Sequence, residues 1–219
     1  MEAKALNIAQ RFMSGNDPSH DIAHANRVVA NAKKLLAMSP EANSIDLDVL
    51  VTIAALHDCM DHKYVSAESL PARIAKVKTA ITNELGFTEA MADYILETID
   101  NISYSKEALG GKAATSDDLY LVLARDADRL ESIGAIGIAR CFAYSGSVNR
   151  LLATNDFQVE KAAAAGTLPE KTNASAVMHF YEKLLNLKTR MKTEAGKRLA
   201  EQRHNFLLAF LQQIHLELD

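Results

Sequence analysis

Apolar residues recur along most of this chain at intervals of three and four, the spacing of a helix with one buried face. The clearest stretch contains Val28, Val29, Ala32, Leu35 and Leu36. No alternating apolar and polar run between turn dipeptides predicts a sheet. The sequence therefore predicts an all-α fold, with further helices over 47–56, 69–85, 88–99, 117–133, 174–191 and 194–218.

Polar residues mark the ends of several predicted helices. Asp46 and Thr88 stand where N-caps are expected. Between the helices, the segments 103–116 and 144–169 are predicted as loops that line a pocket. No internal repeat or interdomain linker is present, so we expect one domain over 1–219, with a core at about 16–145 and C-terminal helices at about 170–218.

His57 and Asp58 end the apolar run from Leu50 to Leu56. A buried helix avoids imidazole and carboxylate groups unless something satisfies them. One bound cation would satisfy both side chains. A His-Asp pair is common by chance, so the interpretation depends on further ligands elsewhere in the chain.

Further candidate ligands occur on two other predicted helices. His24 stands at the start of the helix that contains Val28, although a histidine there is more often a surface or cap residue. Asp126 and Asp128 lie inside the helix over 117–133, where aspartate is unfavourable. Ion pairs with Arg125 and Arg129 explain one of these aspartates but not both, because they point about 200° apart. The apolar stripe favours Asp126 as the inward side chain.

Composition limits the classes of function. The chain has 219 residues, a net charge of −4 and two cysteines. The charge argues against a nucleic-acid polymer as partner, and two cysteines form no disulfide framework. No signal-peptide core or membrane-spanning run is apparent, so we expect a cytoplasmic protein without membrane contact. Homo-oligomerisation is left open.

Four segments together resemble the HD-domain superfamily of metal-dependent phosphohydrolases, and within it a bacterial subgroup of stand-alone proteins described as nucleotide pyrophosphatases. The similarity runs from about residue 16 to the C-terminus. The segments are Ser19-His-Asp-x-x-His24-x-x-Arg-Val, Leu-His57-Asp-x-x-Asp61-x-Lys63, Asp126-Ala-Asp-Arg-Leu-Glu-Ser-Ile-Gly-Ala-Ile-Gly-Ile-Ala-Arg140 and His179-Phe-Tyr-Glu-Lys-Leu-Leu.

The resemblance implies an all-helical fold and a metal held by His24, His57, Asp58 and Asp128. It selects Asp128 over Asp126, since the family pattern is Ala-Asp-x-Leu. Glu131 departs from that pattern, which has aspartate there, but it conserves the charge.

Two imidazoles and two carboxylates favour Mn²⁺, Ni²⁺, Co²⁺, Fe²⁺ or Mg²⁺ in octahedral geometry, with positions left for water and a phosphate oxygen. Such a cation activates water and polarises a phosphoryl oxygen.

Other polar residues near these ligands are candidates for roles in catalysis and substrate binding. On a continuing helix, Asp61 would lie on the metal side and act on the attacking water alongside the ligand Asp58. A surface carboxylate at a helix end is the alternative for Asp61. Lys63, Arg27 and, more weakly, Arg140 are expected to bind substrate phosphates. A second pair, His20-Asp21, lies in a loop and is interpreted as supporting the site or touching substrate.

Two classes of function remain open from the sequence. One is an enzyme that cleaves nucleoside triphosphates to monophosphates and pyrophosphate, with a nucleotide phosphomonoesterase as the close alternative. The other is a non-catalytic helical module that binds a nucleotide or a protein.

Overall fold

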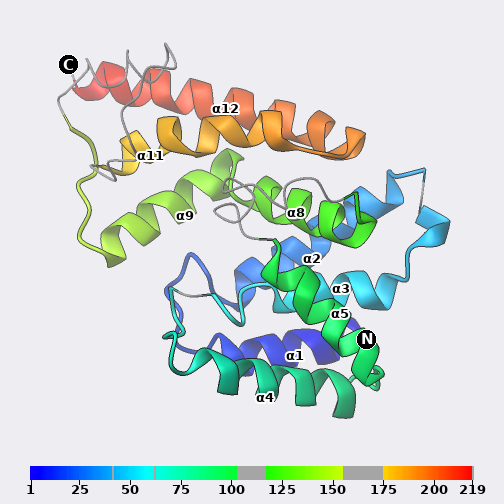
Figure 1. The fold of residues 1–219 in the computed structure, drawn as a ribbon. Helices are drawn as coiled ribbons and strands as arrows, with labels where there is room; N and C mark the ends of the chain where they lie inside the picture. The colour runs from blue at the N-terminus through cyan, green and yellow to red at the C-terminus, as the bar shows by residue number, and fades with distance from the viewer. Residues whose placement is uncertain (41, 62, 103–116, 155–174, 219) are drawn as a thin grey trace. The chain divides into compact units, whose positions relative to one another are not determined.

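The computed structural model describes all residues except 41, 62, 103–116, 155–174 and 219. The described residues are helical, and they contain no strand beyond a single bridge between Leu151 and Ser175 (Figure 1). The predicted all-α fold is therefore confirmed.

The described residues form two compact units. The first comprises Met1–Asn16 and His20–Asp128, and the second comprises Asp17–Ser19 and Arg129–Asp219. The expected single domain is not tested by this division and stays a prediction.

The first unit is built around α3 (Leu47–Leu56), in which all residues from Val49 to Leu56 are buried. Asp46 caps this helix, as predicted, by accepting from the backbone N–H groups of Asp48 and Val49. The other helices of this unit are α1 (Glu2–Phe12), α2 (Ile22–Ala37), α4 (Leu70–Asn83), α5 (Glu89–Asp100) and α8 (Leu119–Glu131), with a 3₁₀ turn at Ala42–Ser44. Contacts of α3 with α1, α2 and α5 place it at the centre of the unit's core.

The second unit contains α9 (Gly134–Ser147), α11 (Ala176–Glu182), a 3₁₀ segment at Leu184–Arg190 and α12 (Glu194–Leu218). The rings of Phe142, Phe180 and Phe210 meet in its interior, with centroids 5.6 to 6.1 Å apart. This aromatic cluster joins α9, α11 and α12.

Most predicted helices are confirmed, but three details differ. The helix expected over 174–191 is α11 followed by a 3₁₀ segment, in which Leu184 and Leu187, three residues apart, are both buried. The loop expected from 144 begins later, because α9 continues to Ser147. The N-terminal helix α1 was not predicted. The loop prediction for 103–116, and that for 144–169 beyond residue 154, lie outside the described residues.

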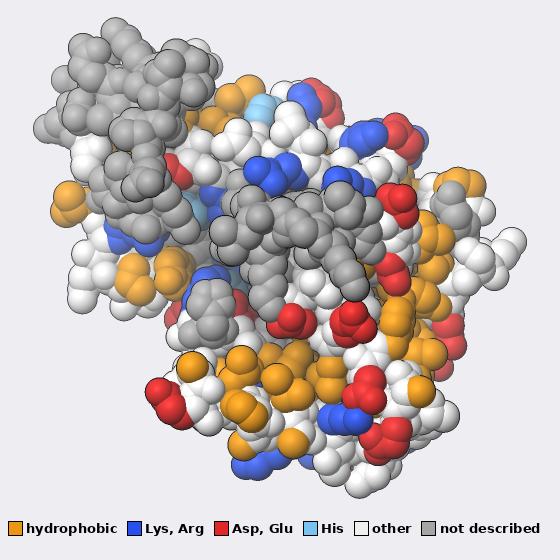
Figure 2. Space-filling view, in the orientation of Figure 1, with side chains coloured by type: hydrophobic (Ala, Val, Ile, Leu, Met, Phe, Trp, Pro, Cys, Tyr) orange, Lys and Arg blue, Asp and Glu red, His pale blue; other side chains and the backbone are white. Residues whose placement is uncertain are grey.

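Acidic and basic side chains alternate on the face drawn in Figure 2, where the described residues present no continuous basic surface. Along the described part of the chain, no helix is both long and apolar enough to cross a membrane.

Candidate metal centre

The start of α2 positions His24. Asp21 is the N-cap of this helix, and its side chain accepts a 3.0 Å hydrogen bond from the backbone N–H of His24. The cap fixes the first turn of the helix, and the His24 side chain is buried in the first unit. Asp21 is thus a structural cap that supports the site through the backbone of His24.

His57 is the C-cap residue of α3, and a backbone contact fixes the orientation of its imidazole. Its Nδ1 lies 2.8 Å from the carbonyl oxygen of Ala54. A carbonyl oxygen only accepts, so Nδ1 carries the proton and Nε2 presents a lone pair. This is the arrangement by which proteins prepare a histidine for metal binding.

Asp58 lies between the two imidazoles. Its Oδ1 is 3.4 Å from His57 Nε2 and its Oδ2 is 3.3 Å from His24 Nε2. Oδ2 is buried and makes no hydrogen bond with any described residue. Burial raises the pKa of Asp58, but the imidazoles of His57, His24 and His20 outweigh that effect and hold the pKa well below its ordinary value. Asp58 is therefore an anion with an unfilled acceptor, directed at two histidine nitrogens.

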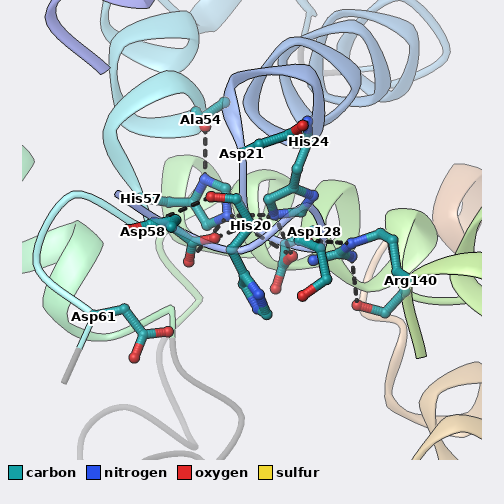
Figure 3. A network of polar contacts seen from close by, with 12 residues as sticks. His20, Asp21, His24, Ala54, His57, Asp58, Asp61, Asp128 and Arg140 are labelled. Carbon is teal, nitrogen blue, oxygen red and sulfur yellow. Dashed lines mark hydrogen bonds and ion pairs between the residues drawn. The ribbon is translucent and has the colours of Figure 1, made fainter. Parts of the chain in front are cut away.

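The Nε2 atoms of His24 and His57 are 3.1 Å apart, and Figure 3 shows the two rings and the Asp58 carboxylate converging. Two ligands at right angles with metal bonds of about 2.1–2.2 Å would be separated by about 3.0–3.1 Å. His24, His57 and Asp58 offer ligand atoms within 4.8 Å of one another, so these residues could hold a divalent cation. The donor set fits the group that the sequence implies.

Asp128, on α8, is brought to the same place. Its Oδ1 lies 3.6 Å from His24 Nε2 and 3.8 Å from His57 Nε2. Asp126 is fully buried, whereas 32% of the Asp128 side chain is exposed. The apolar stripe of α8 therefore includes Asp126, as its pattern indicates, and Asp128 stands beside the stripe and faces the histidines.

Asp61 and Lys63 lie beyond the end of α3. Because that helix ends at Leu56, the expectation that Asp61 follows on a continuing helix is wrong. Asp61 Oδ1 accepts from the backbone N–H of Lys63 at 2.9 Å, and its Oδ2 is 3.5 Å from Lys63 Nζ. The carboxylate stands apart from the imidazoles in Figure 3. A catalytic role for Asp61 stays a prediction.

His20 and Tyr64 form a contact that the sequence did not reveal. The Tyr64 hydroxyl is 3.0 Å from His20 Nδ1, and Lys63 Nζ is 3.4 Å from His20 Nε2. The His20 ring also packs edge-on against that of His24, with centroids 5.9 Å apart. The motif around His20 hinted at such a role, but no pattern pointed to Tyr64.

The two candidate arginines lie in different units. Arg27 is half-buried on α2, one turn after His24. In the second unit, Arg140 Nε donates to the backbone oxygen of Ser19 at 2.7 Å, and its Nη1 is 3.4 Å from Ser132 Oγ. Substrate binding by either arginine stays a prediction.

Comparison with known proteins places this geometry in a family. No family model matches the chain. The protein YpgQ of Bacillus subtilis (strain 168) is 30% identical over 212 residues, which cover 95% of this chain and 89% of YpgQ. The crystal structure of YpgQ in complex with ADP superposes with a TM-score of 0.70 at 26% identity, covering 99% of this chain and 97% of YpgQ.

An HD-superfamily hydrolase from Bacillus thuringiensis is 29% identical to this chain, with a TM-score of 0.66 and coverage of 99% of this chain and 95% of the hydrolase. This chain belongs to the HD-domain superfamily. Membership supports a metal-dependent phosphohydrolase in general, and the His-Asp cluster is where such an HD-domain protein would hold its metal.

Proposed function

We propose that this protein hydrolyses nucleoside triphosphates to nucleoside monophosphates and pyrophosphate with a divalent cation bound by His24, His57, Asp58 and Asp128. The observation that carries the proposal is the buried Oδ2 of Asp58, which makes no hydrogen bond with the described residues and lies 3.3 Å from His24 Nε2. A buried anionic oxygen beside imidazole nitrogens needs a cation. The ADP in the YpgQ structure supports a nucleotide as the ligand.

The residues of this chain divide the work of such a reaction. When bound, the cation supplies Lewis-acid polarisation of a phosphoryl oxygen and activates water. His57 keeps its Nε2 available because Nδ1 donates to Ala54 O. Lys63 and Arg27 offer positive charge to the phosphate groups.

Asp61 is the proposed base. The water oxygen forms a bond to the α-phosphorus, while the bond between that phosphorus and the bridging oxygen to the β-phosphate breaks. Asp61 takes one proton from the water, and the bridging oxygen leaves as part of pyrophosphate. The carboxylate of Asp61 is already turned toward Lys63, whose backbone N–H donates to Oδ1, so Oδ2 is the atom proposed to take the proton.

Hydrolysis in ¹⁸O-labelled water tests the proposal. Protein supplied with Mn²⁺ is mixed with ATP, and the products are followed by phosphorus NMR and mass spectrometry. Attack at the α-phosphorus places the label in AMP and releases unlabelled pyrophosphate. ADP and orthophosphate would indicate terminal cleavage, and orthophosphate from AMP would indicate a phosphomonoesterase. No turnover of any nucleotide with any of Mn²⁺, Ni²⁺, Co²⁺, Fe²⁺ and Mg²⁺ would indicate a binding module.

A further inference from the structure

His20 lies beside the metal centre without belonging to it. Its ring packs against that of His24, and its backbone oxygen accepts from Asn16 Nδ2 at 3.0 Å. Figure 3 shows the His20 ring next to the converging side chains of the cluster. The backbone contact fixes where the ring begins, and contacts at the two ring nitrogens fix how it is turned.

The two nitrogens of His20 have different neighbours. Nδ1 is 3.0 Å from the Tyr64 hydroxyl, and Nε2 is 3.4 Å from Lys63 Nζ. When the hydroxyl donates to Nδ1, the ring proton is on Nε2, so Nε2–H and the ammonium are both donors. Two donors cannot satisfy each other, but an anionic oxygen accepts from both.

Lys63 is also only loosely held by its acidic neighbour. Asp61 Oδ2 lies 3.5 Å from Lys63 Nζ, longer than the ~2.7–2.9 Å of a close charge-assisted hydrogen bond. The ammonium is 37% exposed on its side chain and can turn toward an arriving anion at small cost.

We propose that His20 Nε2–H and Lys63 Nζ together bind a phosphate oxygen of the substrate, and that Tyr64 is the positioning residue that holds His20 in the donating tautomer. The phosphate would be received next to the ligand His24, because the His20 and His24 rings are in contact. This inference rests on the proposed function in one respect, that the substrate carries phosphate groups.

Calorimetric titration of the Mn²⁺-loaded protein with ADP and with inorganic pyrophosphate tests the inference without requiring turnover. The variants are His20→Gln, Lys63→Met and Tyr64→Phe, with Lys33→Met as a matched control, since Lys33 pairs with Glu2 on the surface. We expect His20→Gln and Lys63→Met each to weaken both probes roughly tenfold or more, as for hydrogen bonds to charged groups. Tyr64→Phe is expected to weaken them about threefold, and Lys33→Met to change neither.

Two further readouts separate positioning from general damage. Titration with Mn²⁺ alone should give an affinity near that of the wild type for all variants, because none removes a proposed ligand. Tyr64→Phe should have no additional effect in the His20→Gln background, because Tyr64 acts through His20.

Unchanged affinity for both probes in His20→Gln and Lys63→Met would overturn the inference. So would a full effect of Tyr64→Phe in the absence of His20, or a wild-type protein that binds neither probe. If the binding pattern is found but no nucleotide is hydrolysed, only the proposed function fails. If ATP is hydrolysed as proposed and the variants bind normally, only this inference fails.

Discussion

The Nδ1–H of His57 donates to the carbonyl oxygen of Ala54, three residues earlier on α3, at 2.8 Å. The helix that carries the ligand thereby also sets its tautomer, and Nε2 is directed toward Asp58 and His24. A donor in the helix backbone's last turn is thus converted into a lone pair at the site. The candidate metal centre depends on where α3 ends as much as on the identity of its residues.

Removing a proposed ligand should abolish hydrolysis without unfolding the protein. We expect His57→Ala and Asp58→Ala to lose essentially all metal-dependent turnover, because each removes a bond to the Lewis acid. Circular dichroism should show wild-type helix content, since α3 ends at Leu56 and requires neither side chain. His215→Ala, in the second unit, is the control and should keep its activity. Near-full activity of His57→Ala with added Mn²⁺ would contradict the mechanism.

The two aspartates of α8 should respond differently to the same substitution. Asp128→Asn is expected to weaken Mn²⁺ binding at least tenfold, because its Oδ1 faces both histidines. Asp126→Asn should keep the metal and lower the free energy of unfolding by about 1–3 kcal/mol, because its carboxylate is fully buried. Metal titration and chemical denaturation measure the two effects. Loss of the metal in Asp126→Asn alone would reverse the assignment.

The N-cap of α2 should couple helix stability to the metal centre. Asp21→Ala removes the acceptor of the His24 N–H and is expected to cost about 1 kcal/mol. Mn²⁺ affinity should fall with it, because the capped residue is itself a proposed ligand. Asp21→Asn retains a capping side chain and should restore both quantities. Asp46→Ala, at the N-cap of α3, should lower stability by a similar amount, and an equal loss of Mn²⁺ affinity there would argue against a specific effect of Asp21.

Asp61→Asn separates a catalytic base from a structural carboxylate. The amide oxygen can still accept from the Lys63 N–H, so thermal stability should hardly change. If Asp61 takes the proton from water, kcat should fall about 10²–10⁴-fold with little change in KM. Retention of wild-type kcat would leave Asp61 with its role in the turn alone.

The helical fold could be predicted from periodicity, because buried faces impose the three-four spacing on sequence. Caps such as Asp46 and Thr88 were equally legible, and both accept the expected backbone hydrogen bonds. The helix α1 escaped prediction since its buried positions include Ala5 and Ala9, which give a weak apolar signal.

The site was less legible where it depends on the path of the chain after a helix. The position of Asp61 follows from the end of α3 at Leu56, and no residue pattern forecast that end. The contact between Tyr64 and His20 joins residues 44 positions apart, which local spacing does not encode. For Asp126 and Asp128, periodicity correctly placed Asp126 among buried residues, but burial on a helix does not identify the face that lines a metal centre.

The most direct test of this account is a crystal structure of the protein with Mn²⁺, with the metal located by its anomalous scattering. The account predicts one strong peak at about 2.0–2.4 Å from His24 Nε2, His57 Nε2 and carboxylate oxygens of Asp58 and Asp128. A peak bound elsewhere, or one that leaves Asp58 without a metal contact, would contradict it.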